Sequence, residues 1–350
     1  MKLPRLKNDK LPEIRLNRLQ IEMKKNIDQK VKKAVYQFEK IKCPICLVDD
    51  SELIGEKDRY GLYFPTNICV SCGLIYTSPR MNQQSYGEFY NNEYRKLYGG
   101  SDKPTNHFFL EQKWRGKQIY SFLENVENFN PESLFVLEVG CGAGGILGFF
   151  KEKGAEVLGI DLGEEYIEYG KQIHNLNLFT GALNEIEIKK KPDLIIYSHC
   201  LEHILDVSNE IELIKKISKK DTIIYIEIPG VKNIHINYDM NILKYFQNAH
   251  TFHFTLETLS NLMGKSGFKL LAGNQKVQSA FVLDNKNINK NNDYNNVVNY
   301  IELIERKRKY YSFTLLGISK NLKKTVIKFL YFTKTMELAR SVLSSISKKK

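Results

Sequence analysis

The fold is decided by one stretch, which reads Leu-Phe-Val-Leu-Glu-Val-Gly-Cys-Gly-Ala-Gly-Gly over residues 134–145. An apolar run that ends in closely spaced glycines and continues into a second apolar segment predicts a buried strand, a tight turn and a helix. Glycines let the backbone approach a ligand closely, and a helix start directs free N–H groups at polar ligand atoms. The next apolar run, residues 157–161, ends in Asp161, an acid that can accept ribose hydroxyls. The stretch therefore predicts a nucleotide-binding turn.

Two ligand classes use this layout, because Gly140, Gly142 and Gly145 also satisfy the dinucleotide pattern G-x-G-x-x-G. Glu138 separates the two classes. It is a carboxylate two residues before the first glycine, inside an otherwise apolar strand. A pyrophosphate would be repelled there, whereas a cationic ligand without phosphate, such as S-adenosylmethionine (SAM), suits the position. The sequence favours SAM.

Three stretches resemble the class I SAM-dependent methyltransferases. Residues 137–144 are similar to the first motif of that superfamily, residues 198–206 (Ser-His-Cys-Leu-Glu-His-Ile-Leu-Asp) to the segment after its fourth strand, and residues 253–268 to its closing segment. The resemblance spans roughly residues 110 to 284. It implies an α/β fold with a Rossmann-like, seven-stranded, mostly parallel sheet, SAM as cofactor and methyltransferase activity.

The resemblance also implies a set of cofactor residues. These are Glu138, Gly140, Gly142, Gly144, Asp161, Leu162, Ala182, Leu183 and His199. The acid should face the amino group of the methionine part, and the glycines should give close approach. Asp161 should bind the ribose, Leu162 should cover the adenine, and the backbone of Ala182 or Leu183 should contact the adenine.

Strand and helix patterns alternate regularly after residue 134. Strands are predicted over residues 135–140, 156–161, 178–183, 193–199, 222–229, 268–277 and 279–284, and helices over 144–153, 164–174, 206–218 and 256–266. The last two strands have no helix between them, so they should form a hairpin that places an antiparallel strand at the edge of the sheet. Residues 229–255 form a long insertion at the carboxyl end of the fifth strand, and we expect it to line the acceptor pocket.

Two C-x-x-C pairs, Cys43/Cys46 and Cys69/Cys72, are separated by 22 residues. Thiolates three apart can point at one metal, and two such pairs complete a tetrahedral sulfur set, so a structural zinc ion is predicted. Residues 69–90 are similar to the N-terminal zinc-binding region of bacterial methyltransferases that include deoxysugar C-methyltransferases. The tyrosines at 86, 90, 94 and 98, with Phe89, form an aromatic stripe that either packs this module onto the core or closes over the cofactor.

Three histidines are candidate catalytic groups: His199, His203 and His250. A base is needed only if the acceptor must lose a proton. His199, after the fourth strand and beside the expected methyl group, is the best placed of them. The segment His199-x-x-Glu202-His203 also resembles the Glu-x-x-Glu-His metal segment of quinone and RNA 2′-O-methyltransferases, but a histidine replaces the first glutamate, which weakens the case for magnesium.

Charge divides the chain into a core and two basic flanks. The net charge is +12, with 13 Lys and Arg against 5 Asp and Glu in residues 1–42, and 15 against 4 in residues 286–350. The predicted order is a basic helical arm (1–42), a zinc-binding module (43–80), a helical linker or lid (81–130), the methyltransferase domain (131–284), an Asn/Lys-rich linker (285–297) and basic amphipathic C-terminal helices (298–350). The basic tail can lie on an anionic membrane surface, dock on a partner or pack on the chain itself.

The leading hypothesis is a SAM-dependent methyltransferase whose small-molecule acceptor is a sugar or a cell-surface glycan precursor. The alternatives are an RNA methyltransferase that uses the basic flanks, and a non-catalytic protein that binds zinc and SAM. The N-terminus lacks an apolar signal core and no apolar run reaches membrane-span length, so the expected location is cytoplasmic, with peripheral association at the inner membrane face as a further expectation.

Overall fold

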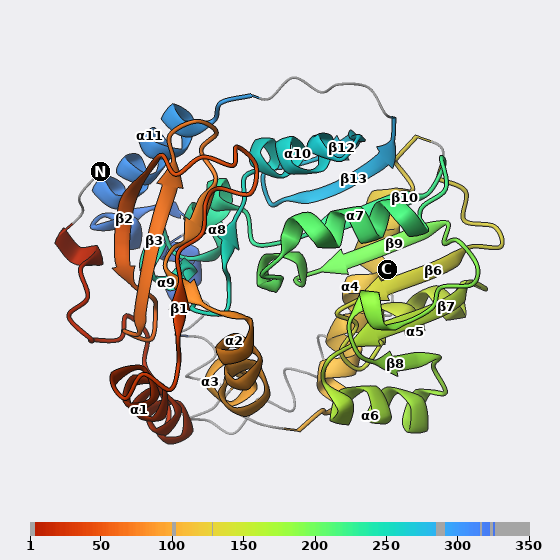
Figure 1. Ribbon diagram of the computed structural model, residues 1–350, viewed down its shortest axis with the longest axis horizontal. Coiled ribbons are helices and arrows are strands. Elements are labelled where there is room, and N and C mark those ends of the chain that lie inside the picture. Colours follow the sequence, from red (N-terminus) through yellow and green to blue (C-terminus); the bar gives the residue numbers. More distant parts are fainter. Residues whose placement is uncertain are drawn as a thin grey trace.

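The structure is a computed structural model that describes residues 4–99, 103–127, 129–284, 291–315, 317–322 and 325. Its largest sheet has seven strands and lies beside the N-terminal part of the chain (Figure 1). The strand order is β12-β13-β10-β9-β6-β7-β8. The strands are β6 (Phe135–Val139), β7 (Glu156–Asp161), β8 (Leu178–Thr180), β9 (Leu194–Ser198), β10 (Ile223–Glu227), β12 (Phe268–Gly273) and β13 (Gln278–Leu283). The five strands from β10 to β8 pair in parallel, and β13 is antiparallel to both of its neighbours. The predicted α/β, mostly parallel fold is confirmed.

The predicted hairpin of the last two strands is present, but its predicted position is wrong. β13 does not lie at the edge of the sheet, because it pairs with β10 on one side and with β12 on the other. The physical reason is burial. Ala280 and Phe281 of β13 are fully buried, whereas β12 is largely half-buried or exposed after Phe268, which suits β12 to the edge position.

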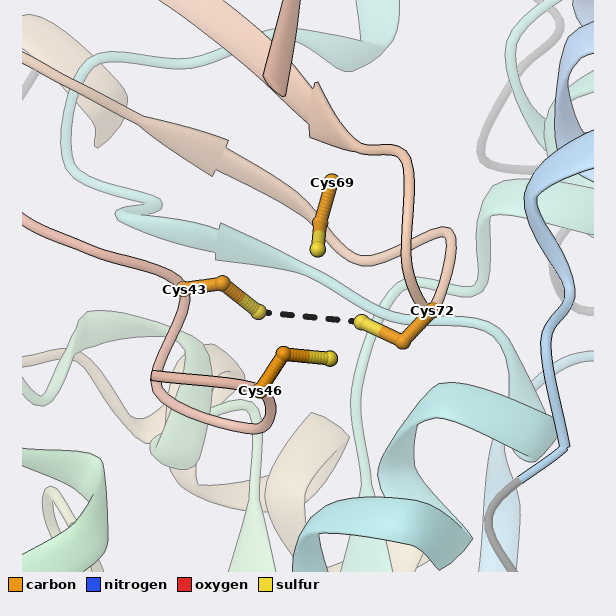
Figure 2. Close-up of side chains that lie close together, drawn as sticks. All are labelled: Cys43, Cys46, Cys69 and Cys72. Carbon is orange, nitrogen blue, oxygen red and sulfur yellow. Dashed lines mark hydrogen bonds between the residues drawn. The ribbon is translucent and has the colours of Figure 1, made fainter. Parts of the chain in front are cut away.

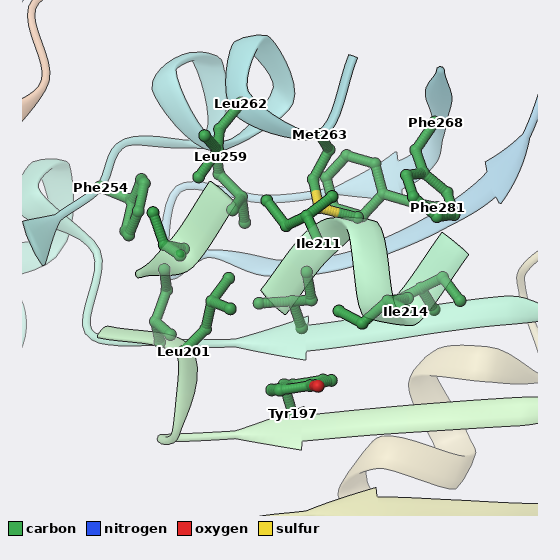
Figure 3. Packing of buried hydrophobic residues seen from close by; sticks show 14 of the residues in the cluster. Tyr197, Leu201, Ile211, Ile214, Phe254, Leu259, Leu262, Met263, Phe268 and Phe281 are labelled. Carbon is green, nitrogen blue, oxygen red and sulfur yellow. The ribbon is translucent and has the colours of Figure 1, made fainter. Parts of the chain in front are cut away.

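Helices cover both faces of the sheet. α4 (Asn106–Leu123), α5 (Gly145–Glu152) and α6 (Glu164–His174) contribute buried side chains to one apolar cluster, and α7 (Val207–Ile217) and α10 (Leu256–Lys265) contribute to another. Figure 3 shows side chains of α7 and α10 meeting above the sheet. The strand-to-helix turns place the carboxyl ends of β6, β7, β9 and β10 at one edge, where ligands bind in such sheets.

The N-terminal residues form a second, smaller sheet with the order β11-β4-β3-β2. β2 (Ser51–Lys57), β3 (Tyr63–Cys69) and β4 (Ile75–Thr77) come from the N-terminal part of the chain, and β1 (Phe38–Glu39) pairs separately with β5 (Arg80–Met81). β11 (Phe252–His253) comes from the insertion after β10 and pairs antiparallel with β4. The insertion therefore joins the N-terminal module to the large sheet.

The remaining helices pack around this smaller sheet. They are α1 (Arg18–Lys32), α2 (Gln83–Phe89), the π-helical η2 (Tyr90–Tyr94), α3 (Arg95–Gly99), α8 (Ile234–Asn237), α9 (Ile242–Tyr245) and α11 (Tyr294–Arg308), with short 3-10 turns η1 (Pro4–Leu6), η5 (Val231–Asn233) and η6 (Tyr311–Phe313). Two further 3-10 turns, η3 (Leu183–Glu185) and η4 (Leu201–His203), follow β8 and β9 of the larger sheet. Asn17 caps α1 through a reciprocal hydrogen-bond pair with Gln20. The buried stripe of α11, residues 297, 301 and 304, packs in one cluster with Leu6, Phe64 and Tyr245.

The basic tail predicted over residues 298–350 is only partly described. α11 covers its first residues, and Lys320 donates to the Ile236 carbonyl at 2.7 Å and to Asp239 at 2.9 Å. Residues 326–350, with most of the expected amphipathic stripe, lie outside the described residues. Among the helices that the structure describes, none combines the length and apolar character that a membrane span requires.

Candidate active site

The glycine turn after β6 places backbone where side chains would collide. Gly140 has a φ of +77°, and a Cβ there would stand 2.6 Å from the sulfur of Cys200; a Cβ on Gly142 would stand 2.9 Å from Nε2 of Gln112. Both glycines line a cavity. Gly144 differs, because its Cβ would meet Leu176 at 2.8 Å, so this glycine lets α5 pack closely against the neighbouring strands. The glycines of this turn thus have two roles: Gly140 and Gly142 bring the backbone to the cavity, and Gly144 allows α5 to pack closely.

Asp161 stands at the carboxyl end of β7 and is held by backbone donors. Its carboxylate accepts the Gly142 N–H at 2.9 Å and the Gly163 N–H at 2.7 Å. Nη2 of Arg95 lies 3.3 Å from Oδ1, and the Arg95 guanidinium lies 3.8 Å from the centre of the Tyr166 ring. Arg95 lies between Tyr94 and Tyr98 of the aromatic stripe, so the segment that carries the stripe reaches the predicted ribose acid directly.

Glu138 is buried in β6, with 1% of its surface exposed and no hydrogen-bond partner for Oε2. Burial raises the pKa of this carboxyl well above its ordinary value, nearby Asp161 raises it further, and Arg115 acts in the opposite direction. Within the described chain Glu138 is not among the residues that line the cavity. A buried carboxylate with an unmet acceptor is a position where a positive charge would be favourable.

The cavity has a volume of about 610 Å³, within the range of ligand sites, which is about 300–1,000 Å³. One wall is made by the carboxyl ends of the parallel strands and by α4, through Gly140, Gly142, Asp161, Ser198, Gln112 and Arg115. The other is made by the N-terminal module, the stripe and the insertion, through Arg59, Tyr90, Tyr94, Tyr98, Tyr238 and Gln247. A single cavity therefore adjoins both the glycine turn and the predicted acceptor side.

The three predicted catalytic histidines come together around Glu202 in this cavity. His199 has a φ of +54°, which is unusual for a residue with a side chain, and its N–H donates to the Glu227 carbonyl at 2.7 Å. Its Nδ1 lies 3.6 Å from Oε1 of Glu202. The rings of His203 and His250 are 4.7 Å apart and nearly perpendicular.

Both of these buried rings favour the neutral form. Burial lowers the pKa of His203, although Glu202 and a hydrogen bond with the backbone of Ala249 act in the opposite direction. Burial and the neighbouring His203 lower the pKa of His250 well below its ordinary value. Neutral imidazoles can accept a proton or bind a metal ion.

Three chain segments hold the histidine side of the cavity in place. The N–H of Thr251 donates to the Glu202 carbonyl at 2.9 Å, and the Tyr86 hydroxyl donates to the Ala249 carbonyl at 2.7 Å. The buried Asp58, in the turn between β2 and β3, accepts the N–H of Asn248 at 3.1 Å. The same turn carries Arg59 into the cavity. The N-terminal module is therefore part of the cavity wall.

The aromatic stripe divides between the two roles considered for it. Tyr86 and Phe89 are buried in an apolar cluster with Met23 and Ile27 of α1. Tyr90 and Tyr94 stack with ring centres 4.4 Å apart, and both line the cavity together with Tyr98.

The other predicted cofactor residues lie away from the cavity lining of the described chain. Leu162 is 57% exposed, and Leu183 is buried in the core. The N–H of Ala182 donates to Oε2 of Glu185 at 2.7 Å. Sequence reasoning missed Arg59, Arg95 and Gln112, which have no motif around them, because their places depend on how distant segments pack.

The four cysteines Cys43, Cys46, Cys69 and Cys72 form a separate cluster (Figure 2). Their sulfur atoms all lie within 4.8 Å of one another, and those of Cys43 and Cys72 are 3.6 Å apart. The side chains point toward a common centre from two places in the chain, the turn at residues 43–46 and the end of β3 with the turn that follows it. This arrangement fits a tetrahedral ion with four thiolate ligands and no open coordination position.

The comparison with family models matches the part of the chain from α4 into β12. Residues 112–272 match a family model described as a methyltransferase domain. Similar solved structures include a SAM-dependent methyltransferase from Archaeoglobus fulgidus (22% identity, 58% of this chain and 92% of that chain, TM-score 0.37). They also include magnesium protoporphyrin IX methyltransferase from Synechocystis (18% identity, 57% of this chain and 98% of that chain, TM-score 0.41). A third is a protein from Pyrococcus horikoshii (14% identity, 56% of this chain and 99% of that chain, TM-score 0.42). No curated protein gives a significant match.

Proposed function

We propose that the protein is a class I SAM-dependent methyltransferase, which transfers the methyl group of SAM to a sugar or to a small precursor of a cell-surface glycan. The match of residues 112–272 to a family model described as a methyltransferase domain supports this proposal. The observation that carries the proposal is the single cavity shared by the glycine turn, Asp161 and the aromatic and cationic side chains of the N-terminal module and insertion. Methyl transfer from a sulfonium is an in-line displacement, so holding donor and acceptor together supplies much of the catalysis.

In this proposal the cofactor is held by the carboxyl ends of β6 and β7. Gly140 and Gly142 allow the backbone to approach it, and the remaining acceptor capacity of the Asp161 carboxylate receives the ribose hydroxyls. From its buried position in β6, Glu138 attracts the positively charged methionine end of SAM electrostatically. Arg95, which lies on Asp161 and Tyr166, shifts to admit the ribose.

The acceptor occupies the wall of the cavity that the N-terminal module and insertion form. Tyrosine rings such as Tyr94 and Tyr98 offer flat apolar faces with polar rims, which suit a sugar ring. Arg59 supplies a positive charge for an anionic leaving or carrier group such as a phosphate. His199 orients the acceptor or receives its proton.

The four-cysteine cluster holds a structural zinc ion in this proposal. Cys43, Cys69 and Cys72 are buried in the same apolar cluster as Tyr197 of β9 and Leu259 of α10, and Cys46 is partly buried against it. Zinc binding would therefore stabilise the contact between the N-terminal module and the methyltransferase domain, and so the wall that carries Arg59.

The basic residues of 312–350 hold the enzyme at an anionic membrane surface in this proposal, where a lipid-linked glycan acceptor would be found. The support is the charge distribution of the sequence, with basic flanks around an acidic middle. Lys320 donates a hydrogen bond to Asp239 within the fold, so in this proposal the residues after Lys320 contact the membrane.

The test is transfer of a labelled methyl group from SAM to nucleotide sugars, quinones and total RNA, each assayed with the full-length protein. The proposal predicts labelled nucleotide sugar or glycan precursor. Labelling of RNA, with binding that falls steeply as salt rises, would instead establish the RNA methyltransferase alternative. SAM binding without transfer to any class would favour the non-catalytic alternative.

A further inference from the structure

We propose that Glu202, His203 and His250 form a second metal site, which binds a divalent transition-metal ion in the wall of the cavity. Their ligand atoms all lie within 4.8 Å of one another, and all three residues are buried. None of them belongs to the four-cysteine cluster, so the site is distinct from the proposed zinc site.

The strongest observation is the unmet bonding capacity of these groups. Glu202 is 1% exposed, yet neither carboxylate oxygen has a hydrogen-bond partner, and Nδ1 of His203 also has none. The imidazole nitrogens nearest to Oε1 of Glu202 belong to His199, at 3.6 Å, and to His250, at 4.0 Å. These distances are too long for hydrogen bonds, and a buried carboxylate without a donor is unfavourable. One cation would satisfy the carboxylate and the imidazole together.

The separation of the ligand atoms is close to what an ion requires. Ligands bound at about 2.1 Å in a tetrahedral arrangement are about 3.4 Å apart, so a closure of about 1.4 Å at most, shared among three side chains, would complete the site. The ligands are also fixed relative to one another by the main chain. Glu202 and His203 share the turn η4, and the Glu202 carbonyl accepts both the N–H and the hydroxyl of Thr251, the residue after His250.

The ligand set indicates which ions would bind. Two imidazoles with one carboxylate suit zinc, cobalt, iron or manganese, whereas magnesium and calcium prefer oxygen ligands. All three residues line the cavity, so an ion bound to them would keep coordination positions open to the acceptor.

The role of the ion rests on the proposed function. A hydroxyl oxygen of the acceptor would bind the ion at an open position, which makes its proton more acidic. As this oxygen bonds to the methyl carbon, the carbon–sulfur bond of SAM breaks and its electron pair stays on sulfur. The hydroxyl proton passes through His199, which lines the same cavity, to solvent. The site therefore selects an acceptor that is methylated on oxygen.

The experiment measures uptake of Co²⁺ by metal-free, full-length protein to which one equivalent of Zn²⁺ per chain has been restored, using equilibrium dialysis with metal analysis. Zinc binds thiolates more tightly than cobalt does, so the four-cysteine cluster stays filled. The variants are Glu202→Gln and His250→Asn, with His107→Ala as the control, because His107 is an exposed histidine that lines the same cavity and pairs with Glu111. SAM affinity is measured on every sample to establish that each variant is folded.

The wild type and His107→Ala should each bind one further Co²⁺ per chain, and the other two variants should bind it about 100-fold more weakly or worse, since even indirect changes to metal sites cost about 10–100-fold. Mg²⁺ should not compete. Folded, SAM-binding wild type without the further Co²⁺, or variants that retain it, would overturn the proposal. Co²⁺ binding at Glu202 by a protein that does not bind SAM would keep the metal site and refute the proposed function.

Discussion

Gly140→Ala tests whether residue 140 must be a glycine because the Cys200 side chain lies so close to it. The new Cβ would stand 2.6 Å from the sulfur and 2.7 Å from the Cβ of Cys200, at a φ of +77°. A side chain in this left-handed region costs about 1–2 kcal/mol, and overpacking adds about 1–3 kcal/mol. Alanine also restricts the unfolded chain, which returns about 0.4–1 kcal/mol. The net loss of unfolding free energy should be about 2–4 kcal/mol, measured by urea denaturation.

Gly154→Ala is the matched control for this prediction. Gly154 has a φ of +90°, and a Cβ there would have nothing within 4 Å. This variant carries only the backbone term and should lose about 1 kcal/mol. SAM affinity should fall in Gly140→Ala and stay unchanged in Gly154→Ala. Equal stability losses in the two variants would refute the argument that contact with Cys200 requires a glycine at 140.

Three further outcomes follow from the structure. Cys69→Ser should remove about one zinc per chain and lower the melting temperature while SAM binding persists. Ser71→Ala, a change at an exposed residue of the same C-x-x-C segment, should alter neither the zinc content nor the melting temperature. Zinc retained by Cys69→Ser would contradict the four-thiolate site. Burial raises the pKa of Asp58 to about 6 from its ordinary 3.8, so the protonated form of Asp58 favours the folded state. The unfolding free energy of wild type relative to Asp58→Asn should therefore be highest below about pH 4 and decline by roughly 3 kcal/mol as the pH rises to about 6. A difference that does not change with pH would count against this burial effect. A chain ending at Thr325 should lose the binding to anionic vesicles that the full chain shows at low salt, and equal binding by the two chains would remove the membrane proposal.

The larger sheet was predictable because its determinants are local. Apolar runs and glycine turns place β6, β7 and β9 within a residue or two of their predicted ranges. The position of β13 was not predictable in the same way. Either strand of a hairpin can be the one that pairs with the rest of the sheet. The strand that does so is covered on both faces, and the fully buried Phe281 suits β13 to that place.

The candidate site was predictable only where a motif carries it. The spacing of the glycines and cysteines specifies local geometry, so Gly140, Asp161 and the four-cysteine cluster could be found in the sequence. Arg59 reaches the cavity because Asp58 binds the backbone of residue 248, a contact across 190 positions of the chain. His250 meets Glu202 for a similar reason, through hydrogen bonds to Thr251. Contacts of this kind depend on the packing of whole segments and leave no local pattern.

Calorimetric titration of SAM into the full-length protein measures whether the glycine turn and Asp161 bind SAM, with Asp161→Ala as the variant and Glu164→Ala, an exposed neighbouring acid, as its control. We expect one SAM per wild-type chain, unchanged SAM affinity in Glu164→Ala, and a loss of SAM affinity of about 1–3 kcal/mol, or about five- to 150-fold, in Asp161→Ala. Undiminished SAM affinity in Asp161→Ala, or wild type that binds NAD in place of SAM, would contradict this expectation.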